Sequence, residues 1–176
     1  MKLATLRRPF PISAEEISVQ SMMVKQNRIR QVENETPVAF LATLTNHAEN
    51  LGENQNIAFD KVITDIGDAY NSHGGLFIAP VSGIYVFSTS IMSYRNTNSH
   101  FAFKRNDNIV TRMYYDGASL GAYNTSCVTI ILQLNKGDDV AVVNLDLDTD
   151  IHGFYYSTFS GFLLQEIYDD TVVMGK

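Results

Sequence analysis

The sequence has little of several features that would narrow its function at once. It has one cysteine, Cys127, so no disulfide can form within the chain. It has no tryptophan and only four prolines, and no apolar run reaches the roughly 20 residues that a transmembrane helix needs. Charged residues make up only 18% of the chain against 45% hydrophobic residues. This composition predicts a packed globular core and argues against global disorder and membrane insertion.

Charge is spread unevenly along the 176 residues. Residues 1–36 hold six Lys and Arg against four Asp and Glu, whereas residues 37–176 hold seven against fifteen. The second part is therefore acidic, which disfavours nucleic acid and anionic membrane surfaces as partners. The acidic charge does not exclude cationic groups, calcium or neutral ligands as binding partners.

Residues 1–36 are predicted to form an N-terminal extension that contains one helix. Ser13 and Glu16 have the spacing of a capping box, and the helix is expected over about Ala14–Val32, with Pro37 ending it. A short coiled coil and a single amphipathic helix both remain open, because polar residues occupy several positions of the heptad seam. The apolar pairs seven residues apart are Ile17 with Val24 and Met22 with Ile29.

From Pro37 onward the apolar residues follow a period of two, which is typical of strands. Polar loops are expected at 46–56 and 65–75. The expected strands are Val38–Leu44, Ile57–Phe59, Val62–Thr64, Leu76–Ala79, Ile84–Met92, Phe101–Lys104, Ile109–Tyr115, Cys127–Leu134, Val140–Leu147 and Ser157–Ile167. About ten short strands without a convincing helix predict an all-β antiparallel sandwich or barrel.

Three blocks of residues, in this order, resemble one known family. The blocks are Phe59, Asp65, Tyr70, Phe77, Gly83, Tyr85 and Phe87; then Leu134-Asn135-Lys136-Gly137-Asp138-Asp139-Val140; then Ser157–Leu164. Their spacing resembles the globular head domain of complement C1q over about Pro37–Ile167. Thr89 departs from the pattern, since the family expects another aromatic residue there.

The resemblance implies that residues 37–176 form a ten-strand antiparallel jelly-roll sandwich that assembles as a homotrimer. A threefold assembly would also bury aromatic side chains that a monomer would expose. It further implies a non-catalytic binding role, in which the protein recognises microbial or carbohydrate ligands in innate immunity. The alternative is a cytokine-like or synaptic-organiser ligand for one cell-surface receptor.

The resemblance also implies an extracellular, secreted protein. Residues 1–12 contain no clear hydrophobic leader, because Leu3–Leu6 is followed at once by Arg7 and Arg8. Either the chain is not secreted by the usual route, or this is a processed or recombinant form.

Asp146, Asp148 and Asp150 form the densest acidic cluster. In a strand they would share one face, and hard oxygen ligands of this kind suit Ca²⁺. The competing interpretation is a solvated loop on an acidic protein. A hydrolase that uses these carboxylates as an acid–base pair has only the cluster in its favour.

A second candidate for calcium comes from the resemblance alone. Several family members bind calcium near the apex of the trimer through two Asp residues eight positions apart, and the matching positions here are Asp116 and Asn124. A neutral amide oxygen in place of a carboxylate would weaken that site. Asn34 and Asn124 also begin glycosylation sequons, and a glycan on Asn124 would compete with its use as a ligand.

The remaining reactive or aromatic side chains have simpler interpretations. The histidines His47, His73, His100 and His152 show no paired metal spacing, although His152 follows the acidic cluster and could make a pH-sensitive contact. Cys127 is expected to be a buried, inert thiol. The pairs Tyr114-Tyr115 and Tyr155-Tyr156 could stack on sugars, but strand alternation would bury one member of each pair.

Overall fold

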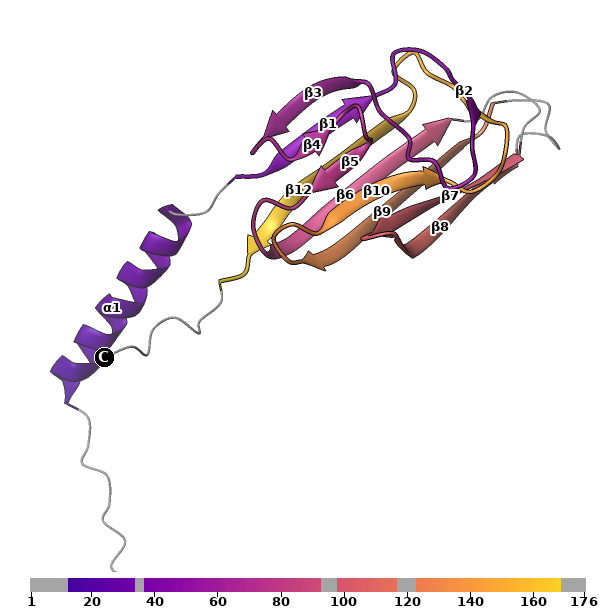
Figure 1. Ribbon diagram of the computed structural model, residues 1–176. Coiled ribbons are helices and arrows are strands. Elements are labelled where there is room, and N and C mark those ends of the chain that lie inside the picture. The colour runs from indigo at the N-terminus through magenta and orange to yellow at the C-terminus, as the bar shows by residue number, and fades with distance from the viewer. Residues whose placement is uncertain (1–12, 34–36, 93–97, 117–122, 169–176) are drawn as a thin grey trace, which may run out of the picture. The chain divides into compact units, whose positions relative to one another are not determined.

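A computed structural model describes residues 13–33, 37–92, 98–116 and 123–168 (Figure 1). The chain divides into two compact units, Met1–Glu35 and Thr36–Lys176. The first unit contains helix α1 (Ala14–Glu33), and the second contains all the strands.

The N-terminus of α1 has the predicted capping box. Glu16 N–H donates to the Ser13 hydroxyl at 3.2 Å, and Ser13 N–H donates to the Glu16 carboxylate at 2.9 Å. These bonds satisfy two backbone donors that have no partner within the helix. The helix therefore starts where the sequence predicted and ends one residue later.

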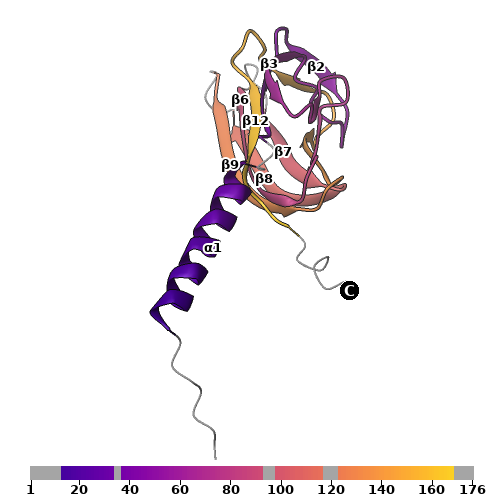
Figure 2. The same ribbon diagram turned by 90° about the vertical axis from the view of Figure 1, so that its left-hand side faces the viewer.

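The second unit is a sandwich of two five-stranded antiparallel sheets with a short two-stranded ribbon (Figures 1 and 2). The strand orders are β3-β1-β12-β6-β9, β4-β5-β10-β7-β8 and β11-β2. This arrangement confirms the predicted all-β sandwich. The strands are β1 (Ala39–Thr43), β2 (Ala48–Leu51), β3 (Lys61–Ile66), β4 (Tyr70–Asn71), β5 (Leu76–Ile78), β6 (Gly83–Met92), β7 (Asn98–Arg105), β8 (Asn108–Asp116), β9 (Thr125–Leu134), β10 (Asp139–Asn144), β11 (Thr149–Ile151) and β12 (Thr158–Glu166).

The described residues contain twelve strands instead of about ten, and the differences lie in the loops. Strands β2 and β4 lie inside the two stretches predicted as polar loops, and both are short and partly exposed, so no apolar run marks them. The short strand β11 lies beyond the predicted strand Val140–Leu147 and was not predicted either. The predicted strand Ile57–Phe59 is wrong, because only Asn56 makes an isolated bridge there. Ile57 and Phe59 are nevertheless fully buried, so burial alone produced the strand-like pattern.

The aromatic residues of the family pattern form the core between the sheets. Phe59, Phe77, Tyr85 and Phe87 are fully buried. Phe159 of β12 lies among five of the core rings. These side chains therefore specify the fold and leave recognition to other residues.

Thr89 and Tyr85 place hydroxyl groups inside this core, and each donates to a backbone carbonyl. Thr89 is only 1% exposed, and its hydroxyl donates to Thr158 O at 2.8 Å. The Tyr85 hydroxyl donates to Val81 O at 2.7 Å, and burial raises the pKa of Tyr85. The departure from the family pattern at Thr89 is thus accommodated without an unpaired polar group.

The block Leu134–Val140 is a structural turn. Gly137 has a φ of +90°, and its N–H donates to Ala79 O at 2.8 Å. The Asp138 carboxylate accepts from the Asn106 amide at 2.8 Å and from Asn135 N–H at 2.9 Å, and these two bonds lower the pKa of Asp138. The acidic residue of this motif therefore ties two turns together.

Candidate functional site

The sheet β3-β1-β12-β6-β9 carries a continuous apolar row on its outer face. The row crosses all five strands, because its members are direct register partners: Ile66 with Ala39, Ala39 with Phe162, Phe162 with Val86, and Val86 with Ile131. We call these five residues the apolar row. Residues in direct register point to the same face of a sheet, so the five side chains lie side by side.

The apolar row is exposed on the single chain. Ile131 is 65% exposed, Ile66 47% and Phe162 45%. Leu164, the next outward residue after Phe162 on β12, is 58% exposed. An apolar stripe of this length is unusual on an isolated soluble domain and is typical of a surface that packs against another protein.

The next row on the same face is uncharged and, apart from Leu41, polar. Ser88 and Thr129 are register partners, and their hydroxyls lie 3.0 Å apart. Cys127 lies further along β9, where its thiol donates to the Ser90 hydroxyl at 3.3 Å. Cys127 is exposed, so the prediction of a buried thiol is wrong: the outward face of an edge strand is apolar enough to resemble a core strand in sequence.

The outer face of the opposite sheet has a different character. There His100 pairs in register with Tyr114, and Ala102 with Arg112. The Lys104 ammonium donates to Asn54 at 3.3 Å. Charged side chains thus share this face with separate exposed apolar residues such as Ile78 and Ile109, and no continuous apolar row crosses its described strands. The first sheet is therefore the better candidate for self-association.

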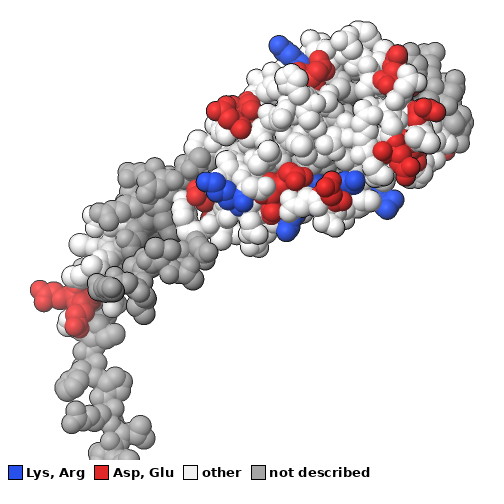
Figure 3. All heavy atoms as spheres, in the orientation of Figure 1, with Lys and Arg blue, Asp and Glu red and all other residues white. Residues whose placement is uncertain are grey.

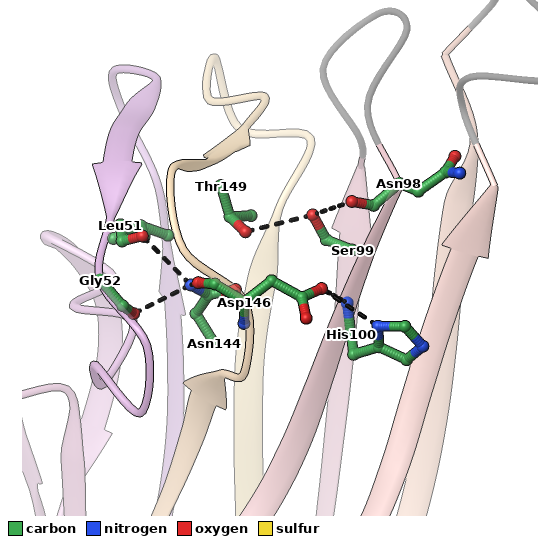
Figure 4. A network of polar contacts seen from close by, with 8 residues as sticks. All are labelled: Leu51, Gly52, Asn98, Ser99, His100, Asn144, Asp146 and Thr149. Carbon is green, nitrogen blue, oxygen red and sulfur yellow. Dashed lines mark hydrogen bonds and ion pairs between the residues drawn. The ribbon is translucent and has the colours of Figure 1, made fainter.

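The acidic cluster does not have the predicted geometry. Strand β10 ends at Asn144, residues 145–148 form a loop, and Asp148 has a φ of +54°. Asp146 accepts from the His100 backbone N–H at 2.7 Å and lies 3.1 Å from its Nδ1 (Figure 4). Asp150 instead accepts from Asn50 N–H at 2.9 Å. The predicted shared face is therefore wrong. Calcium binding by Asp146, Asp148 and Asp150 stays a prediction, without the geometry that motivated it.

Asn144 organises this loop from inside the protein (Figure 4). It is fully buried, and its side-chain amide donates to the carbonyls of Leu51, Gly52 and Asp146. One side chain thus joins the end of β10 to β2 and to the loop that follows it. In the sequence, a polar residue at the end of an apolar strand is the one signal of this role.

Asn144→Ala is expected to lower the free energy of unfolding by about 2 kcal/mol, because three carbonyls lose their donor in a buried site. Urea unfolding measures the loss. Asn108→Ala is the matched control, since the exposed Asn108 amide donates only to nearby Asn106 O. An equal loss in both variants would contradict the assigned role.

Asp116 and Asn124, the second calcium candidates, do lie together. The Asn124 amide donates to Asp116 O at 3.5 Å, and its Oδ1 accepts from Thr125 N–H at 2.8 Å. The Asn124 side chain therefore contacts the backbone of Asp116 where β8 ends, just before β9 begins. The sequon at Asn34 lies outside the described residues.

The end of the sandwich near His152 holds a group of rings that sequence analysis missed. His47 and His152 are 105 positions apart in sequence, yet their ring centroids lie 4.7 Å apart. Tyr155 and Tyr156 are both exposed, at 61% and 58%, so the prediction that alternation buries one of them is wrong. They lie in a loop, where alternation does not apply.

Within the described residues, no group of three or more His, Cys, Asp or Glu side chains is arranged to hold a metal ion. The acidic side chains form separate groups over the visible face of the second unit (Figure 3). Within the same residues, no helix has the length and hydropathy to span a membrane.

Residues 39–164 match the family model of the C1q domain. The chain is 39% identical over 132 residues to the "Heavy metal-binding protein HIP" of Mytilus edulis, covering 72% of this chain and 60% of that protein. It is 38% identical over 136 residues to "Complement C1q tumor necrosis factor-related protein 3" of Mus musculus, covering 75% and 53%. The chain thus spans little more than half the length of these relatives.

Solved structures share the architecture. The globular domain of zebrafish complement 1qA protein superimposes with a TM-score of 0.62 at 19% identity, covering 74% of this chain and 99% of that one. Eiger TNF from S. frugiperda gives 0.64 at 13% identity, covering 77% and 98%. At these identities the likeness concerns the fold alone.

Proposed function

The chain belongs to the C1q domain family, and we propose that it is a secreted, non-catalytic recognition protein that acts as a homotrimer in innate immunity. Its ligands in this proposal are microbial surfaces or carbohydrates. C1q-like and TNF-like domains are generally binding modules without enzymatic activity, and the proposal accordingly assigns this chain no catalytic residues.

The observation that carries the proposal is the apolar row. A cyclic trimer would bury Ile131, Phe162 and Ile66 without burying a charge, because the row and its polar neighbours are uncharged. In a trimer the three copies would present their binding sites in the same direction. Three weak contacts with a repetitive surface would then together give a much higher overall affinity.

A second candidate is a cytokine-like or synaptic-organiser ligand for one cell-surface receptor. The mouse relative, whose name includes tumor necrosis factor, favours it. This alternative predicts saturable binding to one protein that free glycans do not compete away. The heavy metals in the name of the mussel relative are stated of that protein alone.

The test is binding of the full chain to Gram-negative and Gram-positive cells, measured as the fraction of protein that co-sediments with the cells. The proposal expects binding that free glycans reduce. It also expects that a monomeric variant binds at least about tenfold more weakly, because avidity is lost. No binding to either cell type, together with binding to a single receptor protein, would favour the alternative.

Calcium is a further part of the proposal. The Asn124 amide lies within 3.5 Å of the Asp116 backbone carbonyl, so the two residues are neighbours, and a carboxylate with an amide oxygen is a donor set that suits Ca²⁺. The neutral amide supplies less charge than a second carboxylate would. A weak site is therefore proposed at these two residues.

Calcium at saturating concentration is expected to raise the melting temperature by about 5 °C, because a ligand at 100 times its Kd stabilises by about 2.7 kcal/mol. Asp116→Asn should remove most of this shift. The exposed Asp107, in the turn between β7 and β8, provides the control Asp107→Asn. A calcium shift that survives Asp116→Asn would contradict the proposed site.

A further inference from the structure

The loop after β11 presents three consecutive aromatic side chains to solvent. Phe154, Tyr155 and Tyr156 are 57%, 61% and 58% exposed. Phe154 and Tyr155 also have φ values of +53° and +68°, which bulky residues rarely adopt. Unfavourable backbone conformations of this kind gather at functional sites, which makes this loop a candidate for binding.

Contacts with the segment after β1 hold this conformation in place. Phe154 N–H donates to Thr45 O at 3.1 Å, and Tyr155 N–H donates to Leu44 O at 2.9 Å. A side chain on Gly153 would lie 2.0 Å from Asn46 O, so only glycine allows the two segments to approach this closely. The aromatic side chains therefore extend from a backbone that is fixed before any ligand arrives, which lowers the entropy cost of binding.

The rings of His47 and His152 pack against the aromatic side chains. His152 is 9% exposed and contacts the rings of Tyr156 and Tyr123 edge-on, with centroid distances of 5.1 and 4.8 Å. Phe154 contacts the His47 ring in the same way at 5.0 Å. We call Tyr123, Phe154, Tyr155 and Tyr156 the aromatic platform. Tyr123 comes from the residues just before β9 and the other three from the loop before β12, so folding brings them together.

The chemistry around the aromatic platform indicates what it would bind. Segments 44–60, 123–134 and 145–157 contain no Lys or Arg, whereas they contain several acidic residues. Asp60, for example, accepts from Thr45 N–H at 2.8 Å. These segments therefore offer no cationic side chain to anionic lipids, phosphates or nucleic acids. Aromatic faces beside hydroxyl and amide groups suit a ligand with an apolar face and a polar edge.

We propose that the aromatic platform binds a neutral glycan, with the C–H face of a pyranose ring packed on Tyr155 or Tyr156. This inference rests on the proposed function, since it assigns the glycan to a site on the recognition module. The aromatic platform lies in loops beyond the strand ends, whereas the apolar row lies on the face of a sheet. Self-association and ligand binding thus use different residues.

The test measures binding of N-acetylchitotetraose, mannotetraose and laminaritetraose to the full chain by isothermal titration calorimetry and saturation-transfer NMR. At least one oligosaccharide should bind, and its NMR signal should come from ring C–H groups. The double variant Tyr155→Ala/Tyr156→Ala should bind at least about tenfold more weakly. Tyr155→Phe/Tyr156→Phe should retain most of the affinity, because the rings remain. Tyr114→Ala, which removes a 49% exposed tyrosine of β8, should bind as the unchanged protein does.

Three results would overturn the inference. The first is glycan binding that survives the double alanine variant. The second is binding of tetralysine but of none of the oligosaccharides, which would assign the site to a basic protein segment. The third is loss of the trimer in the double variant by sedimentation, which would place these rings between copies. If the full chain still binds bacterial cells in any of these cases, the proposed function stands and only the glycan site on the aromatic platform is refuted.

Discussion

Ile131→Asp is expected to convert the proposed trimer into a monomer. Ile131 is 65% exposed on β9, at the edge of the sheet that carries the apolar row. A carboxylate buried there without a partner would cost several kcal/mol, and threefold symmetry repeats that cost at each interface. The concentration needed for assembly should therefore rise by at least about a thousandfold.

Sedimentation velocity at micromolar concentration measures this change. Ile109→Asp is the matched control, because Ile109 is a 41% exposed isoleucine on β8 of the opposite sheet. The control should remain trimeric, and both variants should keep the circular dichroism spectrum of a β-sheet protein. If both variants stay trimeric, the apolar row is not the interface.

Phe159→Ala is expected to cause the largest loss of stability of any single truncation considered. Phe159 is fully buried on β12 and lies at the centre of the aromatic core. Truncation of a buried phenylalanine to alanine typically costs about 3–5 kcal/mol, through lost burial and the cavity that remains. Its ring-centroid distances are 4.8 Å to Phe40, 5.8 Å to Phe59, 5.9 Å to Tyr70, 6.2 Å to Phe87 and 5.9 Å to Phe103.

Thermal unfolding at one fixed protein concentration should show a melting temperature lower by about 10 °C. Phe154→Ala is the control, since its ring is 57% exposed in the loop and its loss should change the melting temperature by only a few degrees. Similar shifts in the two variants would mean that the aromatic core is not the main source of stability.

The fold could be predicted from the sequence because the core aromatics have fixed positions along it. Strand β6 shows this most clearly: Tyr85, Phe87, Thr89 and Ile91 are all buried, as their alternation predicts. The capping box at Ser13 likewise placed the start of α1 within a residue. Both predictions depend on contacts between residues close in sequence or on a regular period.

The candidate site could be predicted only in part, because it depends on pairing between distant segments. The apolar row joins Ile66 to Ile131 through three intervening strands, and no local pattern shows that register. The two histidines under the aromatic platform meet only after folding. The acidic residues do not share the face of one strand as predicted, because β10 ends at Asn144. The Asn144 side chain bonds to the carbonyl of Gly52, and a loop follows it.

Different parts of the second unit have different roles. The core rings around Phe159 stabilise the sandwich, and the apolar row on one outer face is available for self-association. The loops at the end of the strands hold Asp116 with Asn124 and the aromatic platform. Binding should therefore respond to substitutions in the loops and, through avidity, to substitutions in the apolar row.

Sedimentation equilibrium of the full chain at micromolar concentration tests the central claim most directly. The claim is that this C1q domain assembles through its own sheet face into a trimer. The expected result is a single species of three times the 19.7 kDa chain mass, in the absence of any ligand. A species with the mass of one chain over the whole concentration range would contradict the account.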